Sequence, residues 1–160
     1  MNPNVLVNRS RIEGWADNLE AARDASLRAL ELVPGMTAQH AALGVTLIRL
    51  GKKDEGLAEV AKEHSLGYRL YYGAVAQHLI GAPNEADALL EQVLELGDPW
   101  AFQVATLHAL AGRNDEAFRW LERAYDLRDT GIASSMVSWT LNGLHSDPRW
   151  PAFVAKVGLR

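Results

Sequence analysis

Cysteine is missing from this chain of 160 residues, and so is any long run of apolar residues. Without cysteine the chain has no disulfides, no thiolate catalysis and no sulfur-ligated metal sites. No stretch approaches the roughly 18 apolar residues that a membrane-spanning helix needs, and residues 1–30 hold no apolar run of the length that a signal peptide needs. These absences predict a cytoplasmic chain without a membrane partner.

A basic stripe is lacking as well. The formal net charge is −4, from 16 lysines and arginines against 20 aspartates and glutamates, and the two signs are mixed along the chain. Proteins that bind nucleic acids usually present a concentrated basic face to the phosphates. We therefore expect no nucleic-acid partner.

Catalytic and metal-binding patterns are equally scarce. A helical metal site needs a histidine with a second histidine or a carboxylate four residues away. None of the five histidines meets this condition: His40, His64, His78, His108 and His145. There is no glycine-rich phosphate loop, and no serine lies in the sequence signature of a nucleophile. The sequence predicts no enzyme, no catalytic residue, no cofactor and no metal.

Glycine recurs at a regular interval where helices are expected to end. Gly51, Gly81 and Gly112 each follow an apolar residue, at spacings of about 30 residues. Glycine tolerates the positive φ at which many helices end. Each glycine is followed by a segment typical of a first helical turn, with acidic residues or a proline: Lys53–Glu55, Pro83–Glu85 and Asn114–Glu116. The pattern predicts an all-α fold of antiparallel helix pairs.

Small residues recur in the second helix of each predicted pair, at Ala22, Gly56, Ala86 and Ala117. The residue four positions later lies on the same helix face in each case: Ser26, Val60, Leu90 and Leu121. Small side chains at these positions let neighbouring helices approach closely.

These features resemble the tetratricopeptide repeat, a helical pair of about 34 residues with a Leu-Gly pair, a later glycine and a small residue in the second helix. The best match begins at Leu43–Gly44, and the resemblance covers about residues 4–130. It implies a right-handed α-solenoid of about four antiparallel helix pairs. Residues 131–160 break the period and are similar to the capping segments that follow such arrays in bacterial signalling proteins. The chain 1–160 would then be a single domain.

The closing segment has its own helix signal. Asp147 and Pro148 predict an N-cap followed by proline at the first helical position. One side of this short helix would carry four apolar residues, Trp150, Phe153, Val154 and Val157. We expect the helix to cover the open end of the repeat stack.

The resemblance implies a function in protein–protein interaction. In the family, the first helices of successive repeats line a concave groove, and the corresponding positions here are mostly apolar and aromatic. We expect a protein or peptide partner to contact Val45, Ile48, Arg49, Tyr68, Tyr71, Val75, His78, Phe102 and Thr106. Only Arg49 in this set could grip a peptide carboxylate in the way that chaperone-binding relatives do, so we expect no carboxylate clamp.

The tyrosines of this groove form a pattern of their own. Tyr68, Tyr71 and Tyr72 fall at positions i, i+3 and i+4, so they share one side of a helix. They have two interpretations: an exposed patch that anchors a partner's apolar helix or extended segment, or core packing against a neighbouring helix. Two other functions also stay open for the chain, a regulatory or small-ligand-sensing domain of a bacterial signalling protein and a homo-oligomerisation module that forms a homodimer.

Overall fold

The computed structural model describes residues 2–159, which form helices and no strand. The prediction of an all-α fold is confirmed. Contacts divide the chain into two compact units, residues 1–89 and 90–160, called unit 1 and unit 2 below. Their boundary falls inside α6 (Pro83–Glu95). The single domain expected for residues 1–160 stays a prediction. No helix within residues 2–159 combines the length and the apolar composition that crossing a bilayer requires.

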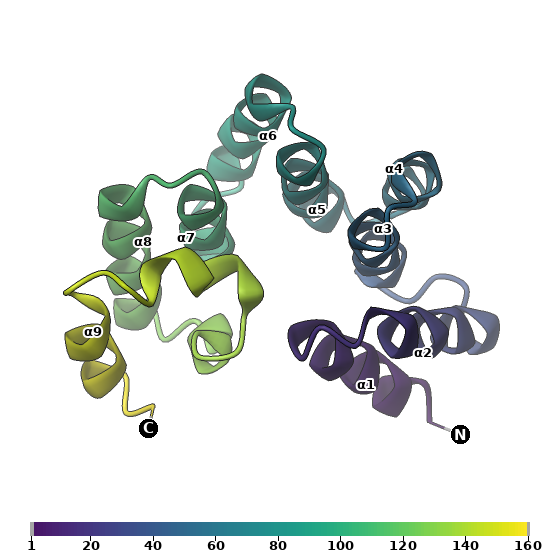
Figure 1. Cartoon of the computed structure of the whole chain (residues 1–160), viewed down its shortest axis with the longest axis horizontal. Helices are drawn as coiled ribbons and strands as arrows, with labels where there is room; N and C mark the ends of the chain where they lie inside the picture. Colours follow the sequence, from purple (N-terminus) through teal and green to yellow (C-terminus); the bar gives the residue numbers. More distant parts are fainter. Residues whose placement is uncertain (1, 160) are drawn as a thin grey trace. The chain divides into compact units, whose positions relative to one another are not determined.

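Unit 1 consists of two helical hairpins and a further helix (Figure 1). Its helices are α1 (Pro3–Trp15), α2 (Leu19–Leu32), α3 (Gln39–Arg49), α4 (Lys53–Ala61) and α5 (Leu66–Leu79). α1 packs against α2, α3 packs against α2 and α4, and α5 packs against α3 and α4. Within unit 1, α1, α3 and α5 lie on one side, whereas α2 and α4 lie on the other (Figure 1).

The predicted turn glycines adopt the left-handed conformation. Gly51, Gly81 and Gly112 have φ angles of 81°, 77° and 70°. The next residue donates its N–H to the carbonyl oxygen five residues earlier, as from Lys52 to Leu47 at 2.9 Å, which satisfies a carbonyl at the end of the helix. The following helices begin at Lys53, Pro83 and Asn114, where the sequence predicts them.

The first hairpin makes the same turn without glycine. Asp17 has a φ of 62°, and Asn18 donates its N–H to the carbonyl of Glu13 at 2.9 Å. Arg49 of α3 reaches this turn: Nη2 lies 2.7 Å from Asp17 Oδ1, and Nη1 donates to the carbonyl of Gly14 at 2.9 Å. Left-handed backbone costs an L residue about 1–2 kcal/mol, so these bonds from α3 offset the strain.

α3 and α4 approach each other at two facing glycines. A Cβ built on Gly44 would lie 2.5 Å from the carbonyl oxygen of Gly56, and a Cβ on Gly56 would lie 2.5 Å from that of Gly44. The side chain of Val60 also lies within 2.6 Å of the Gly44 position. Because the facing atoms belong to backbone, they cannot turn aside, so the contact requires glycine on both helices.

A buried hydrogen-bond chain joins α1, α2 and α3. Ser10 Oγ and Ser26 Oγ lie 2.6 Å apart, and Gln39 Nε2 donates to Ser26 Oγ at 2.7 Å. All three side chains are buried. Each polar group finds a partner inside the unit, so the chain fixes how the three helices align.

His40 and Glu59 connect the α2–α3 loop with α4. The ring of His40 lies between two acceptors, with Nδ1 2.6 Å from Glu59 Oε1 and Nε2 3.0 Å from the carbonyl oxygen of Pro34. It can donate to both only as the imidazolium. Burial alone would raise the pKa of Glu59, but hydrogen bonds from Lys62 and His40 outweigh burial and hold this pKa below the ordinary value.

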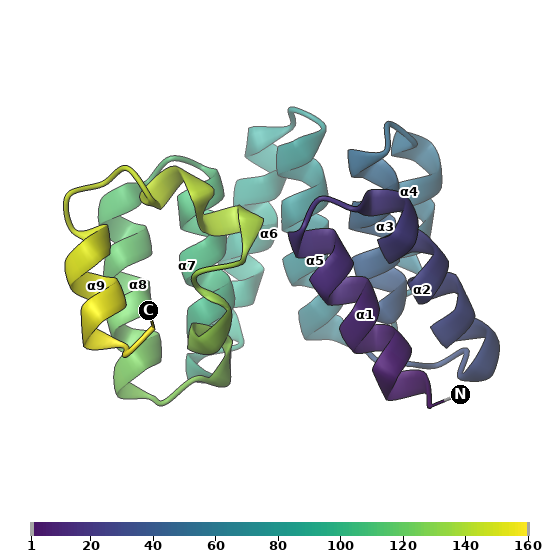
Figure 2. The ribbon, with the colours of Figure 1, turned by 60° about the horizontal axis from the view of Figure 1, so that its bottom comes forward.

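Unit 2 combines one complete helical hairpin with the closing segment. Its elements are η1 (Asp98–Trp100), α7 (Ala101–Leu110), α8 (Asn114–Asp126), η2 (Thr130–Ser134), η3 (Trp139–Leu144) and α9 (Trp150–Lys156), of which the η elements are 3-10 helices. α7 packs against α8 and η3, and α9 lies beside α8 (Figure 2). Leu121 of α8, Leu141 of η3 and Phe153 of α9 share one buried core.

The apolar side of α9 is confirmed, but its predicted start is wrong. Trp150 and Phe153 are buried, and Val154 and Val157 pack against the same core. The helix begins at Trp150, with Arg149 as N-cap and Pro151 in the first turn, so Asp147 and Pro148 precede it. Asp147 Oδ1 accepts the N–H of Arg149 at 3.0 Å instead, because its carboxylate closes the turn before the helix.

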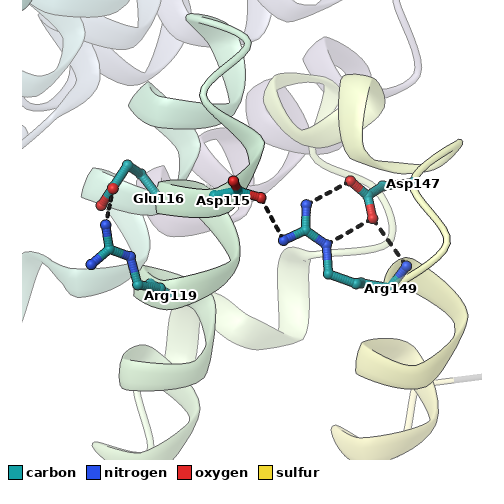
Figure 3. A network of polar contacts seen from close by, with 5 residues as sticks. All are labelled: Asp115, Glu116, Arg119, Asp147 and Arg149. Atoms are coloured by element: carbon teal, nitrogen blue, oxygen red, sulfur yellow. Dashed lines mark hydrogen bonds and ion pairs between the residues drawn. The ribbon is translucent and has the colours of Figure 1, made fainter.

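Arg149 fastens this turn to α8 (Figure 3). Its guanidinium pairs with both carboxylate oxygens of Asp147, at 2.9 and 2.8 Å, and with Asp115 Oδ1 at 2.8 Å. The same group lies 4.4 Å from the ring centre of Phe118. Hydrogen bonds from Arg149 hold the pKa of Asp147 well below its ordinary value. Glu116, next to Asp115, forms a separate pair with Arg119, one turn later on α8 (Figure 3).

Asp129 ties the α8–η2 turn to the start of α7. Its Oδ1 accepts the N–H of Gly131 at 2.8 Å, and its Oδ2 accepts the N–H of Phe102 at 3.2 Å. Gly131 lies directly against Phe102, since a Cβ there would be 2.5 Å from the ring. This turn therefore covers Phe102.

We predict that Gly44→Ala lowers the free energy of unfolding by at least about 1–3 kcal/mol, the usual cost of overpacking, because its methyl group meets the backbone of α4. Denaturant unfolding followed by circular dichroism measures the change. Gly14→Ala is the matched control, since its Cβ would have only an ordinary contact, 3.9 Å from Ala22 Cβ. Equal stability of the Gly44 variant and the wild type would contradict the contact.

We predict that Glu59→Gln lowers the free energy of unfolding at neutral pH by about 1.5 kcal/mol, as expected for losing charged hydrogen bonds. The pKa of Glu59 is lowered in the folded state, so its stabilisation is present above the ordinary carboxylate pKa and is lost as pH falls through the folded value. The difference in the free energy of unfolding between the wild type and the Glu59→Gln variant should therefore disappear at acidic pH.

Unfolding curves across the acidic range measure this gap. Glu55→Gln serves as the control, because Glu55 is 64% exposed and its pair with Lys52 at 3.2 Å is a surface one, worth at most about 1 kcal/mol. A gap that stays constant down to strongly acidic pH would show that the charge of Glu59 is not what stabilises the loop.

Candidate partner-binding surface

Three tyrosines of α5 contact one another on unit 1. The ring centres of Tyr71 and Tyr72 lie 4.9 Å apart in an edge-on arrangement, and those of Tyr68 and Tyr72 lie 6.4 Å apart. All three side chains are partly exposed. The helical spacing thus yields a real aromatic cluster, which combines packing with access to solvent.

The surroundings of Tyr72 disfavour its ionised form. Burial raises the pKa of Tyr72 above the usual tyrosine range, and the neighbouring Tyr71 and Tyr68 add to the rise. The positive charge of Arg11 acts in the opposite direction. Arg11 belongs to α1, and the carboxylate of Glu63, in the turn before α5, adds to the rise in the pKa of Tyr72.

The α1 side of this surface is formed by Arg11 and Trp15. The guanidinium carbon of Arg11 lies 5.2 Å from the ring centre of Trp15, within cation–π range, and Nη2 donates to Asn8 Oδ1 at 3.0 Å. Trp15 is partly exposed. We call Arg11, Trp15, Tyr68, Tyr71 and Tyr72 the aromatic–arginine surface. Sequence reasoning did not include Arg11 and Trp15 in the site.

The predicted site residues of α3 lie mostly inside unit 1. Val45 and Ile48 are buried, at 5% and 9% exposure. The side chain of Arg49 is 14% exposed, and its guanidinium binds Asp17 and the carbonyl of Gly14. These residues hold the unit together, and they offer little surface.

The other predicted residue of α5, Val75, is buried at 1% exposure, and His78 is partly exposed near the end of the helix. Phe102 and Thr106 belong to α7 of unit 2, where they are buried at 7% and 0%. The α8–η2 turn covers Phe102, as described above. Of the predicted set, Tyr68, Tyr71 and His78 therefore retain the most accessible side chains.

Surface cavities lie elsewhere, among them one in each unit. One of about 680 Å³ is bounded in unit 1 by α2, α3 and α4, with Leu27, Leu43 and Leu47 among its apolar lining. The charges around it are paired within the chain, Arg23 with Asp24, Lys52 with Glu55 and Lys62 with Glu59. The other, of about 540 Å³, lies in unit 2 beside Tyr125, Ile132 and Val157.

No metal-binding cluster is found in the part of the chain that the structure describes. Residues 2–159 hold no group of three or more histidine, aspartate or glutamate side chains arranged to bind a metal. His108 accepts a hydrogen bond from Arg113 Nε at 3.1 Å, and the ring of His145 stacks 4.6 Å from that of Trp150. Both histidines thus have structural contacts.

Comparison of the chain with protein-family models, curated proteins and solved structures finds no match. The function proposed below is therefore based on the geometry of the chain itself.

We predict that one of the four tyrosines resists ionisation, and that Tyr72→Phe removes this late step. Free tyrosine ionises near pH 10, and the pKa of Tyr72 is raised above this. A raised folded pKa contributes stability at lower pH that is lost as pH rises through the folded value. A titration followed by tyrosinate absorbance tests this, with Tyr125→Phe as control. An unchanged late step in Tyr72→Phe would refute the assignment.

Proposed function

We propose that the chain is a tetratricopeptide-like interaction module that binds a protein or peptide segment. Hairpin turns at an interval of about 30 residues, each with a left-handed residue, support a repeat array, as does the glycine contact between α3 and α4. The array would be a right-handed α-solenoid. The core that η3 and α9 share with α7 and α8 supports a capping role for residues 131–160.

The observation that carries the binding proposal is the tyrosine cluster of α5. Three partly exposed aromatic rings, in which Tyr72 contacts both Tyr68 and Tyr71, form one aromatic surface. Tyrosine and tryptophan lose little conformational entropy on binding and are enriched among the residues that dominate binding energy. A partner's apolar helix or extended segment would cover the rings, with Trp15 beside them.

We propose no reaction for this chain. A regulatory small-ligand site is the second candidate, and the observation that favours it is the cavity in unit 2, whose 540 Å³ falls within the size range of ligand pockets. The binding experiment separates the two functions, because a small-ligand sensor would not select peptide sequences through α5.

The test is selection from a displayed peptide library, followed by affinity measurement of the selected peptides on purified variants. Tyr71→Ala should weaken binding about tenfold or more, the loss of a typical aromatic anchor. Circular dichroism first confirms that the variant is folded. Tyr125→Ala is the matched control, since Tyr125 is a 37% exposed tyrosine of unit 2.

Peptides that bind the wild type and the Tyr125 variant equally, and the Tyr71 variant weakly, are the expected result. Equal binding to all three proteins would place the site elsewhere. A library that yields no specific peptide would contradict the interaction module itself.

A further inference from the structure

Charge in unit 1 is divided between its two sides. α1, α3 and α5 carry four arginines, Arg9, Arg11, Arg49 and Arg69, against one acid, Glu13, a net charge of +3. α2 and α4 together carry three basic and six acidic residues, a net charge of −3. The two sums cancel, so the division is invisible in the composition of the chain.

Two of the three acids near the basic side are paired within the chain, and the third is buried. Glu13 pairs with Arg9 at 3.5 Å, and Asp17 pairs with Arg49 at 2.7 Å. Glu63, in the turn before α5, is 3% exposed, so it presents little charge to solvent. The local carboxylates are thus occupied or covered.

Two arginines remain without a carboxylate. Within residues 2–159, Arg11 contacts the amide oxygen of Asn8 and the ring of Trp15, and Arg69 Nη1 donates to the carbonyl of Glu63 at 2.7 Å. Arg69 directly follows Tyr68 and lies three residues before Tyr72, on adjoining faces of α5. Positive charge without a carboxylate partner therefore stands on both helices that carry these aromatic residues, at Arg11 of α1 and at Arg69 of α5.

We propose that the aromatic–arginine surface, together with the neighbouring Arg69 of α5, binds an acidic peptide segment, with aspartate or glutamate side chains against the two arginines and apolar side chains on the tyrosines. This inference rests on the proposed function and names the chemistry of its partner. Guanidinium and carboxylate form strong, paired hydrogen bonds. The contacts involve carboxylates of side chains, so the segment needs no free C-terminus.

A peptide fits this surface better than a nucleic acid does. Nucleic-acid binding draws its affinity from neutralising many phosphates in a row. Only two arginines here are without a carboxylate, and the whole chain is acidic, with a net charge of −4. A short segment with a few acids matches the number of available cations.

The test uses two labelled probe peptides, both amidated at the C-terminus, one alternating glutamate with leucine and one alternating lysine with leucine. Fluorescence anisotropy with the full chain should show preference for the glutamate peptide and weaker binding as salt rises. Arg11→Glu should weaken binding of the glutamate peptide about tenfold. It should also reduce or reverse the preference for the glutamate peptide over the lysine peptide. A single-stranded oligouridylate is the third probe.

Arg28→Glu is the matched control, because Arg28 is an exposed arginine of α2. The substitution changes the net charge of the chain by the same amount as Arg11→Glu. It should leave the affinity nearly unchanged. Equal weakening by the two variants would mean that only net charge matters, which overturns the proposal. Tighter binding of the oligouridylate than of the glutamate peptide would also overturn it.

The outcomes separate this inference from the proposed function. Equal binding of both peptides, weakened by Tyr71→Ala, would refute the acidic preference and leave the interaction module standing. Absence of binding by both probe peptides, together with a peptide library that selects nothing, would refute both.

Discussion

The approach of Gly44 to Gly56 is the contact on which the arrangement of unit 1 depends. It brings the backbones of α3 and α4 together, with each carbonyl where the other helix would carry a side chain. α3 also packs against α2 and α5, so the helices of unit 1 are built around it. Leu43 and Leu47 line the cavity beside α2 and α4, whereas Arg49 extends to the α1–α2 turn. The distance at one glycine pair thus sets where several other contacts fall.

Much of this fold is determined by residues close together in the sequence, and those features could be predicted. The three turn glycines and the acidic first turns mark the hairpins, because each acts through its own backbone conformation. The spacing of Tyr68, Tyr71 and Tyr72 likewise follows from helix geometry alone. The start of α9 was missed because two prolines, Pro148 and Pro151, could each stand in a first helical turn, and the prediction placed Pro148 there. The bond between Asp147 and the N–H of Arg149 decides between them.

The parts of the site that sequence reasoning missed depend on contacts between distant segments. Phe102 occupies a position that lines a groove in the resembling family, but here Gly131 and Asp129 cover it from a turn that belongs to no repeat. Arg11 and Trp15 lie in a first helix that lacks the repeat signature, so register could not assign them. Counting charges helix by helix would have revealed the arginines, whereas totals for the whole chain conceal them.

Asp17 gives the first hairpin a different dependence on the rest of the chain. A turn closed by glycine carries its conformational freedom in its own residue, so it can form as soon as its two helices meet. The turn at Asp17 is held by Arg49, which lies 32 residues later in the sequence. The stability of the N-terminal hairpin turn is therefore coupled to the docking of α3.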